Sequence, residues 1–441
     1  MLPSRAPLSA PLRDVGGKEG CVVAPGMRRE VGDGAHAIDP TGPTVRTPIA
    51  RQGSSPDTRP DGFSWRLAAF YAAFFAFSGI SMPFFPAWLQ AKELDARATG
   101  IVLAVPMFMR LISVPSAARL ADRRNALRAA LISSAFGSAA AYLILSQMSG
   151  FVLILVAVSL ASLATAPTMP LLDAYAVKGL ALRGRAYGPV RLWGSVAFVF
   201  ANFAAGFLID RIAPVQIIWL LCGSLVIVAA VALTLRPLAE NRGSTENADA
   251  TAVKLLLSPG FWMVTGGASL IQASHAVYYG FSVLGWRAKG LEASSIGGLW
   301  GLAVIAEIVL FAFSARFQRR LGALGLLGTG AFSAVLRWGA MSLNPPLVLL
   351  PLLQLLHALS FGATHLGSMQ LLAHLAPARQ FATAQGDFAT VLALVMAGGM
   401  ALSGVLYADL GDRAYAAMAV AAALGGLFVL LARSWVRQTG G

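Results

Sequence analysis

Residues 170–195 read PLLDAYAVKGLALRGRAYGPVRLWGS. This stretch joins the end of one long apolar segment, a short basic turn and the start of the next apolar segment. Asp173 and Arg191 are ionisable residues set inside those hydrophobic runs. Charged side chains are costly in lipid and need a partner or a water-filled cavity. The stretch therefore predicts two membrane-spanning helices whose charges serve a function.

The composition of the whole chain predicts the same environment. Of the 441 residues, 57% are hydrophobic and 12% are charged, and the mean hydropathy is +0.68. No soluble domain of this size buries so much apolar surface, so lipid must surround most of it. The net charge of +14 falls in loops and in the N-terminal segment, which argues against nucleic acid as a partner. The two cysteines lack metal-ligand spacing, so we expect no metal site and no cofactor.

Twelve apolar segments follow the polar residues 1–64, which are rich in Pro, Gly, Arg and Ser and predict a disordered cytoplasmic tail. Each segment is near the ~20 residues that a helix needs to cross a bilayer. Together they predict an all-α membrane protein, because backbone in lipid must satisfy its hydrogen bonds within each helix. The expected spans are 65–90, 98–119, 126–147, 150–177, 188–210, 214–236, 259–286, 294–317, 322–342, 346–375, 380–408 and 412–434.

Lys and Arg are distributed unevenly between the two sides that these spans create. With the N-terminus inside, the inner segments hold about 25 basic residues and the outer loops about 6, which predicts that both termini are cytoplasmic. The polar loop 237–258 separates 65–236 from 259–436, with six spans on each side. Two pseudo-symmetric six-helix halves are the arrangement of major facilitator transporters, whose substrate site lies at the interface of the halves near the midplane.

Each predicted half carries a basic turn after its second span, ARLADRRNALR at 118–128 and ARFQRRLGALG at 315–325. The first resembles the cytoplasmic loop motif of the major facilitator superfamily, in which an acid, a basic residue and a glycine follow a small residue. Asp122 and Arg123 match this motif, whereas Ala118 and Asn125 replace its glycines. The second copy lacks the acid. A plain positively charged loop is the alternative interpretation of both turns.

Two further stretches resemble one branch of that superfamily. They are PLLDAYA (170–176) with YGPVRLWGSVAF (187–198), and IQASHAVYYGFSVLGWRAKG (271–290) with IGGLWGLAVIAEIVLF (296–311). Together they look like the phenylpropionic acid transporters, which are near the nucleoside and oligosaccharide proton symporters. The resemblance covers roughly 65–436. It implies proton-linked uptake of a small organic molecule across the bacterial inner membrane by a protein that is usually a monomer.

Two residues near the predicted midplane are candidates for proton coupling. Glu307 lies about thirteen residues into its span, where a carboxylate is costly when ionised and is therefore readily protonated. The alternative is a structural carboxylate paired with Arg337 or Arg110. His357 also lies near midplane and could relay protons, because imidazole titrates near neutrality.

Several other intramembrane residues are candidates for substrate binding. Arg110 and Arg337 keep their charge in lipid, so each must face a substrate carboxylate or an internal acid, and both alternatives stay open. Spacings of three and four put Gln272, His275 and Tyr279 on one helix face, either as cavity lining or as packing. Trp300 and Phe361 are the aromatic residues that we expect to stack on an aromatic substrate.

Charges nearer the cytoplasmic ends of the spans predict a gate. Asp173 and Arg191 could pair with each other, or with Arg123 and Arg128 of the basic turn, when the carrier faces outward. Asp122 of that turn belongs to the same predicted gate, and Asp387 invites a similar interpretation. A static tie between helices is the alternative.

The leading hypothesis is therefore a secondary transporter that imports a small organic molecule, such as 3-phenylpropionate or a related aromatic acid, with protons, by alternating access. The alternatives are an exporter of drugs or sugars, a nucleoside or sugar proton symporter, and a sensor or an uncoupled facilitator. We do not expect an enzyme, because the chain has no HExxH, no GxSxG and no Asp or His cluster at metal spacing. An ATP-driven pump is not expected either, because there is no Walker loop.

Overall fold

The computed structural model describes residues 62–238, 259–376 and 381–439, all within one compact unit, Pro56–Gly441. The predicted tail (1–64, apart from its last three residues) and most of the predicted linker (237–258) lie outside the described residues. Within them, helices and turns account for the secondary structure and there is no strand. This agrees with the all-α membrane protein that the sequence predicts.

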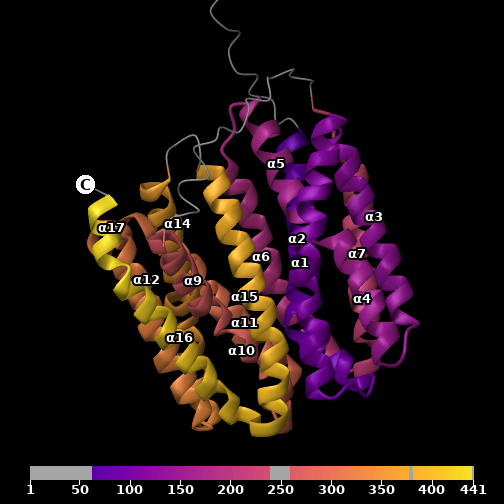
Figure 1. Cartoon of the computed structure of the whole chain (residues 1–441). Helices are drawn as coiled ribbons and strands as arrows, with labels where there is room; N and C mark the ends of the chain where they lie inside the picture. The colour runs from indigo at the N-terminus through magenta and orange to yellow at the C-terminus, as the bar shows by residue number, and fades with distance from the viewer. Residues whose placement is uncertain (1–61, 239–258, 377–380, 440–441) are drawn as a thin grey trace, which may run out of the picture. The chain divides into compact units, whose positions relative to one another are not determined.

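The helices run up and down between the two ends of the bundle (Figure 1). Those of the first half are α1 (Gly62–Ala91), α2 (Ala96–Arg123), α3 (Leu127–Ser146), α4 (Phe151–Thr165), α5 (Thr168–Ala181), α6 (Tyr187–Ile209) and α7 (Ile217–Leu233). Those of the second half are α9 (Pro259–Ala273), α10 (Ala276–Ala288), α11 (Ala293–Ala312), α12 (Ser314–Ser342), α13 (Leu350–Leu355), α14 (Thr364–Leu375), α15 (Phe381–Leu410), α16 (Ala414–Leu431) and the short α17 (Arg433–Thr439). Short 3-10 turns occupy Pro214–Gln216, Leu347–Leu349 and Gly411–Arg413, and a π-helical segment, η3, occupies Ala358–Ala363.

Ten helical ranges in the described part are long and apolar enough to cross a membrane. One of these ranges, Ala384–Leu431, contains both α15 and α16. The predicted span 259–286 is not among the ten, because it is broken into α9 and α10, each of which is short. Every expected span thus corresponds to helical structure, whereas the number of twelve membrane crossings stays a prediction.

Three predicted spans are interrupted near the middle of the bundle. Pro167, which has no backbone N–H to donate, separates α4 from α5. Ser274 lies between α9 and α10, and its hydroxyl oxygen accepts a hydrogen bond from Trp338 Nε1 at 2.9 Å. The π-helical segment η3 lies between α13 and α14. Such irregular backbone inside a membrane protein is tolerated where neighbouring helices satisfy its polar groups.

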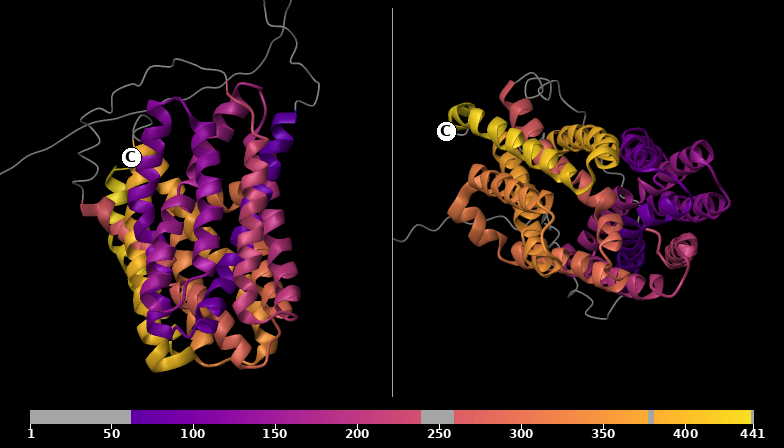
Figure 2. Two further views of the ribbon diagram at one scale, coloured as in Figure 1. Left: turned by 90° about the vertical axis from the view of Figure 1, so that its right-hand side faces the viewer. Right: turned by 90° about the horizontal axis from the view of Figure 1, so that it is seen from below.

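The helices form two groups when the bundle is viewed along its axis (Figure 2). In one group, α3 packs on α4 and α7; in the other, α12 packs on α14 and α16. The groups meet mainly where α1 packs on α10, α2 on α15, and α6 on α11. We call the end of the bundle where α1 begins the tail end, and the end with the turns at 92–95 and 411–413 the far end.

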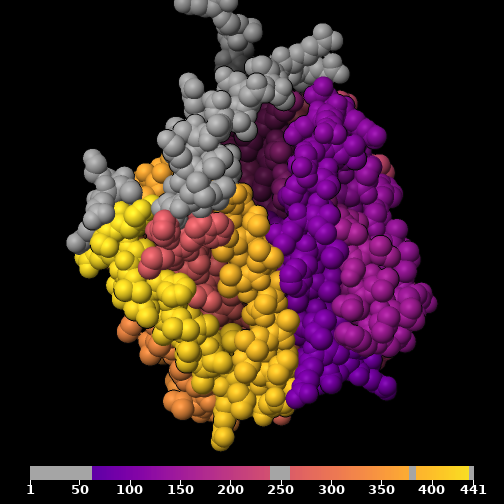
Figure 3. Space-filling model, in the orientation of Figure 1, coloured from indigo at the N-terminus to yellow at the C-terminus, as the bar shows by residue number. Residues whose placement is uncertain are grey.

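The two groups touch backbone to backbone at the far end. A Cβ atom on Gly404 of α15 would lie 2.5 Å from the carbonyl oxygen of Ala96 and 2.9 Å from Cα of Gly100, both on α2. A Cβ atom on Gly206 of α6 would lie 2.3 Å from the carbonyl oxygen of Ala293. Figure 3 shows α2 and α15 in contact toward the far end and a recess between them toward the tail end.

Polar contacts reinforce this closure. Asp210, just after α6, accepts hydrogen bonds from the backbone N–H groups of Ala293 at 2.7 Å and Ser294 at 2.9 Å. These amides open α11, so a residue of the first half caps a helix of the second half. Although partial burial would raise the pKa of Asp210, the two amide donors hold it below its usual value. Arg97 of α2 also pairs with Asp409 of α15 at 2.6 Å.

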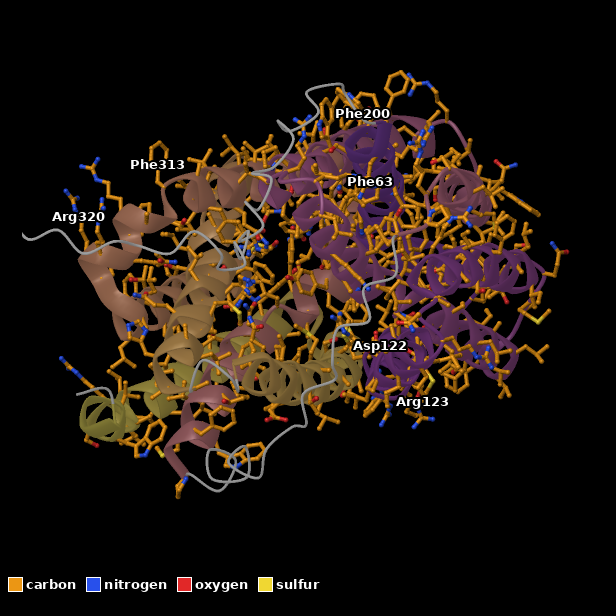
Figure 4. The ribbon with its side chains drawn as sticks, turned by 90° about the horizontal axis from the view of Figure 1, so that it is seen from above. Phe63, Asp122, Arg123, Phe200, Phe313 and Arg320 are labelled. Carbon is orange, nitrogen blue, oxygen red and sulfur yellow. The ribbon has the colours of Figure 1, made fainter. Side chains whose placement is uncertain are left out.

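The outer surface of the helices is apolar. Phe200 on α6 is 71% exposed and Phe313, at the end of α11, is 58% exposed. Both lie at the rim of the bundle when it is seen from the tail end (Figure 4). So many large apolar side chains on an outer surface are expected where lipid, not water, is the solvent.

The glycine contact at the far end generates a test. We expect Gly404→Leu to prevent closure of the far end, because the new side chain would overlap the backbone of α2, and overpacking of this kind costs about 1–3 kcal/mol. Transport should fall about tenfold or more, since about 1.4 kcal/mol is a factor of ten in a population. Spin labels at Ser149 and Asn344, both in far-end turns, should lie farther apart in Gly404→Leu than in the parent protein.

The matched control is Gly398→Leu on the same helix, where an added Cβ meets nothing within 4 Å. It should leave both the transport rate and the distance between the labels near those of the parent protein. For the labelling measurement, the parent carries Cys21→Ser and Cys222→Ala so that no native cysteine is labelled. An unchanged distance in the Gly404 variant would mean that the glycine contact does not control the far end.

Candidate functional site

A cavity of about 960 Å³ lies between the two groups of helices. Side chains of α1 and α6 form one wall, and side chains of α10, α11 and η3 form the other. Its lining residues are Phe75, Met82, Tyr187, Gly188, Pro189, Arg191, Leu192, Ser195, Phe198, Tyr278, Tyr279, Trp300, Ala303, Val304, Glu307, Ile308, Phe311, Ala312, His357 and Phe361. A largely apolar cavity with a few converging polar groups is the usual form of a small-molecule site.

The cavity occupies the tail half of the bundle. Its wall on α6 begins at Tyr187, the first residue of that helix, and its wall on α11 extends to Ala312, the last residue. At the far end, the glycine contacts and the Asp210 cap close the passage. The structure is therefore the state in which the site is accessible from the tail end.

A chain of three ionisable side chains runs from the cavity into the second half. Glu307 Oε2 lies 3.9 Å from His357 Nε2. On the other side of that ring, Nδ1 lies 3.0 Å from a guanidinium nitrogen of Arg337. Arg337 is 1% exposed, whereas Glu307 and His357 both line the cavity. The chain thus links a fully buried cation to a carboxylate on the cavity wall.

The hydrogen bond from Arg337 determines the tautomer of His357. A guanidinium can only donate, so Nδ1 of the neutral imidazole must accept and its proton must be on Nε2. This N–H then faces the carboxylate of Glu307. A proton arriving from the cavity therefore has Glu307 as its acceptor, because Nδ1 of His357 is already occupied.

The remaining contacts of Arg337 show why its charge can be buried. It donates to Gln354 Oε1, and Gln354 Nε2 in turn donates to the hydroxyl of Tyr278 at 3.0 Å. The guanidinium carbon lies 4.6 Å from the ring centre of Tyr278 and 4.5 Å from that of Trp338. Hydrogen bonds and cation–π contacts of this kind offset the loss of water.

Aromatic rings form much of the wall beside this chain. Tyr278 and Trp300 are stacked with ring centres 4.6 Å apart, and His357 and Phe361 are stacked at 5.2 Å. The indole Nε1 of Trp300 is buried and has no hydrogen-bond partner among the described residues. A buried donor without a partner is costly.

Arg191 is the arginine that lines the cavity within the described part of the chain. Its guanidinium carbon lies 4.1 Å from the ring centre of Phe75 and 5.4 Å from that of Tyr71. Asp173 is nearby but accepts hydrogen bonds from Tyr71 at 2.6 Å and Tyr187 at 2.7 Å. No ion pair between Arg191 and Asp173 is formed among the described side chains, which leaves Arg191 available to an anion.

The structure brings together many of the residues that the sequence singled out. Tyr279, Trp300, Glu307, His357 and Phe361 all line the cavity. Arg191, which the sequence assigns to a gate, lines it too.

Four other candidates for substrate contact lie elsewhere. Arg337 is behind the wall, and so is His275, which is 0% exposed and contacts the carbonyl of Gln272 at 3.0 Å and Ser360 Oγ at 3.2 Å. Gln272 is 2% exposed. Arg110 is exposed on α2 and is not part of the cavity lining.

The remaining gate residues lie toward the tail end. Asp122 and Arg123 are at the end of α2, where Figure 4 shows Arg123 at the edge of the bundle and Asp122 farther in. Asp387 is half-buried on α15. The predicted pairing of Asp173 with Arg191 or with the basic turn concerns the state in which the tail end is closed, so it stays a prediction.

The site candidates drawn from the sequence do not include Tyr71, Tyr187, Tyr278 or Gln354. One signal was present: Tyr187, Arg191, Ser195 and Phe198 recur at spacings of four, four and three, which is one face of a helix. The capping contact of Asp210 leaves no such signal, because its partners are 83 and 84 residues away.

The cavity offers binding and proton transfer, and its donors do not suggest metal chemistry. Within the described residues, no group of three or more His, Cys, Asp or Glu side chains could hold a metal ion.

Comparison with known proteins gives consistent relatives. Residues 64–417 match the family described as "MFS_1 like family". The chain is 32% identical over 375 residues to the probable 3-phenylpropionic acid transporter of Escherichia coli K12, covering 81% of this chain and 94% of that protein. It is 27% identical over 345 residues to the maltose permease of Geobacillus stearothermophilus, covering 75% and 85%.

Solved structures share the fold at low sequence identity. The nucleoside transporter NupG has a TM-score of 0.74 with 15% identity, covering 85% of this chain and 99% of that chain. A bacterial homologue of the human lysosomal transporter Spinster, solved in an inward-facing and unoccupied conformation, has a TM-score of 0.69 with 16% identity, covering 86% and 98%. At these identities the likeness concerns the fold alone.

The burial of Arg337 generates a prediction that separates a structural cation from a substrate clamp. We expect Arg337→Met to destabilise the protein by about 3 kcal/mol, because it leaves Gln354 Oε1 and His357 Nδ1 without their buried donor. Thermal unfolding in detergent without substrate measures this effect. In the control Arg191→Gln, the unfolding temperature should stay near that of the wild type.

The opposite pattern would contradict this assignment. If Arg337→Met kept the wild-type unfolding temperature but abolished substrate binding, Arg337 would be the clamp.

Proposed function

Because the chain belongs to the MFS_1-like family of major facilitator membrane transporters, which are not enzymes, we propose that it imports a small aromatic acid, such as 3-phenylpropionate, together with protons. The observation that carries this proposal is the cavity, in which Arg191 and Glu307 lie on facing halves beside an aromatic wall. Similarity to the probable 3-phenylpropionic acid transporter supports the substrate class.

The chemistry of the wall favours an aromatic acid. A substrate carboxylate would be held by Arg191, whose planar fork of donors matches a carboxylate in two hydrogen bonds. The substrate ring would contact Trp300 and Phe361 on the opposite wall. A nucleoside or a sugar, the alternative substrates, would need many more hydrogen-bonding groups than this wall supplies, although the similarity to a maltose permease keeps a sugar as the second candidate.

Proton coupling follows from the position of Glu307. As a carboxylate it balances the buried cation of Arg337 through His357, and as a carboxylic acid it leaves Arg191 as the charged group facing the cavity. A substrate anion would therefore bind better when Glu307 is protonated, because no carboxylate then competes for Arg191 or repels the substrate. Such mutual dependence of substrate and proton is what symport requires.

The side on which the cavity opens indicates the state of the transport cycle. We propose that the tail end is cytoplasmic, since basic residues are concentrated there, so that the structure is the inward-open state in the bacterial inner membrane. The two halves, 65–236 and 259–436, would rock about the site, closing the tail end as the far end opens. We propose a monomer, because one chain contains the complete cavity.

The test is uptake of labelled 3-phenylpropionate into proteoliposomes that have an acidic outside and a neutral inside. We expect accumulation above that of protein-free vesicles, which control for passive entry of the neutral acid. Arg191→Gln should raise KM about 10- to 100-fold, because a hydrogen bond to a charged group contributes about 1.5–3 kcal/mol. The KM of Arg191→Lys should lie between that of the wild type and that of Arg191→Gln.

The matched control is Arg211→Gln, the same change at an exposed arginine just after α6 and far from the cavity. It should leave KM within about twofold. The contradicting result is uptake no greater than that of empty vesicles, with or without the pH gradient, by protein shown to be folded and correctly oriented. This result would exclude phenylpropionate import and shift the search to sugars, nucleosides and export.

A further inference from the structure

A second pair of cavities lies outside the transport site, around the turn between α2 and α3. The outer cavity has about 220 Å³ and the inner one about 300 Å³, and they share Ala121 and Ala126 as walls. Neither shares a lining residue with the central cavity. The two adjoin at these residues near the tail end, and we call them together the groove.

The floor of the groove is a single face of α5. Pro167 and Leu171 line the inner cavity and Lys178 lines the outer one. These residues are spaced four and seven apart, so they lie one above another on the same face of the helix. At ~1.5 Å per residue, Pro167 and Lys178 are about 16 Å apart along the helix axis. The inner cavity therefore lies deeper in the apolar part of the bundle than the outer one.

The inner part of the groove is narrow and apolar. Small side chains of α2 and α3, together with α4, form its walls, and the two outer helices each pack on α4. The wall residues include Ala117, Leu120, Ala129, Ala130, Ser133, Leu163 and Ala164. Such a slot, open at the surface of helices that lipid surrounds, has the dimensions and chemistry of a site for a hydrocarbon chain.

The outer part of the groove is basic. Arg128 and Lys178 line the outer cavity, and Arg124 lines the mouth of the inner one. Asp122 adds one carboxylate, which leaves three cations against one anion. Arg128 Nε donates to the carbonyl of Leu235 at 2.6 Å, which fixes that guanidinium in place at the mouth. Because this turn ends two membrane-spanning helices, the mouth lies at the level of lipid headgroups.

We propose that the groove binds one acidic phospholipid, with its phosphate at Arg124, Arg128 and Lys178 and one acyl chain in the inner slot. Basic pockets between membrane helices are known to hold anionic headgroups. The excess of positive charge at the mouth matches a headgroup with a net negative charge, whereas a zwitterionic headgroup carries no net charge. Free phosphate would leave the apolar slot, the larger of the two cavities, unused.

The test is a titration of the purified protein with dioleoyl phosphatidylglycerol, followed by native mass spectrometry. Dioleoyl phosphatidylcholine, which has the same acyl chains, is the reference lipid. The wild type should bind phosphatidylglycerol in a one-to-one complex and more tightly than phosphatidylcholine. In the double variant Arg124→Gln/Lys178→Gln, binding should weaken about 30-fold, since each basic residue near a membrane surface contributes about 1 kcal/mol.

Two further variants make the test specific. Ser133→Phe fills the slot without changing a charge and should also abolish the tight complex. Arg319→Gln/Arg320→Gln removes two exposed charges from the first turns of α12 in the second half and should change binding less than about threefold. Equal affinity for the two lipids, or equal losses in both double variants, would overturn the proposal, provided that the unfolding temperatures show all variants to be folded.

Discussion

Arg337 places a permanent positive charge inside a protein that lipid surrounds, and the second half of the molecule is arranged around it. The guanidinium cannot lose its proton, so it must find acceptors and rings on neighbouring helices. Gln354 and His357 supply the acceptors, and Tyr278 and Trp338 supply the rings. These partners lie on α10, on α12 and in the segment around α13 and η3. The charge thus ties together the elements that form one wall of the cavity.

The same charge gives Glu307 its special position. Through His357, the carboxylate is linked to a buried cation, yet it lines a cavity that opens toward the tail end. Its ionised form is favoured by the cation and disfavoured by the apolar surroundings. A carboxyl group between these two influences can be charged in one state of the transporter and neutral in the other. The opposite half supplies Arg191, so the two halves offer complementary charges that a substrate can bridge.

The sequence predicts the spans to within a few residues at most of their ends, because a helix in lipid must be long, apolar and bounded by loops. It also singles out Glu307, His357, Trp300 and Phe361, which all line the cavity, since ionisable and aromatic residues at mid-span are few. It expects Arg337 at the substrate and Arg191 at a gate, whereas Arg191 lines the cavity and Arg337 lies behind its wall. Hydropathy carries no information about which face of a helix meets the cavity. The break at His275 and the cap at Asp210 were not predicted, since both depend on partners distant in the sequence.

The central claim is that Glu307 carries the coupling proton, and the most direct measurement compares two transport modes in one variant. Proteoliposomes containing Glu307→Gln would be assayed for exchange of labelled against unlabelled 3-phenylpropionate, and for net accumulation driven by an acidic outside. We predict that exchange is retained at a rate near that of the wild type and that gradient-driven accumulation falls to the level of empty vesicles. Accumulation equal to that of the wild type would contradict the claim and would leave Glu307 as a structural partner of His357 and Arg337.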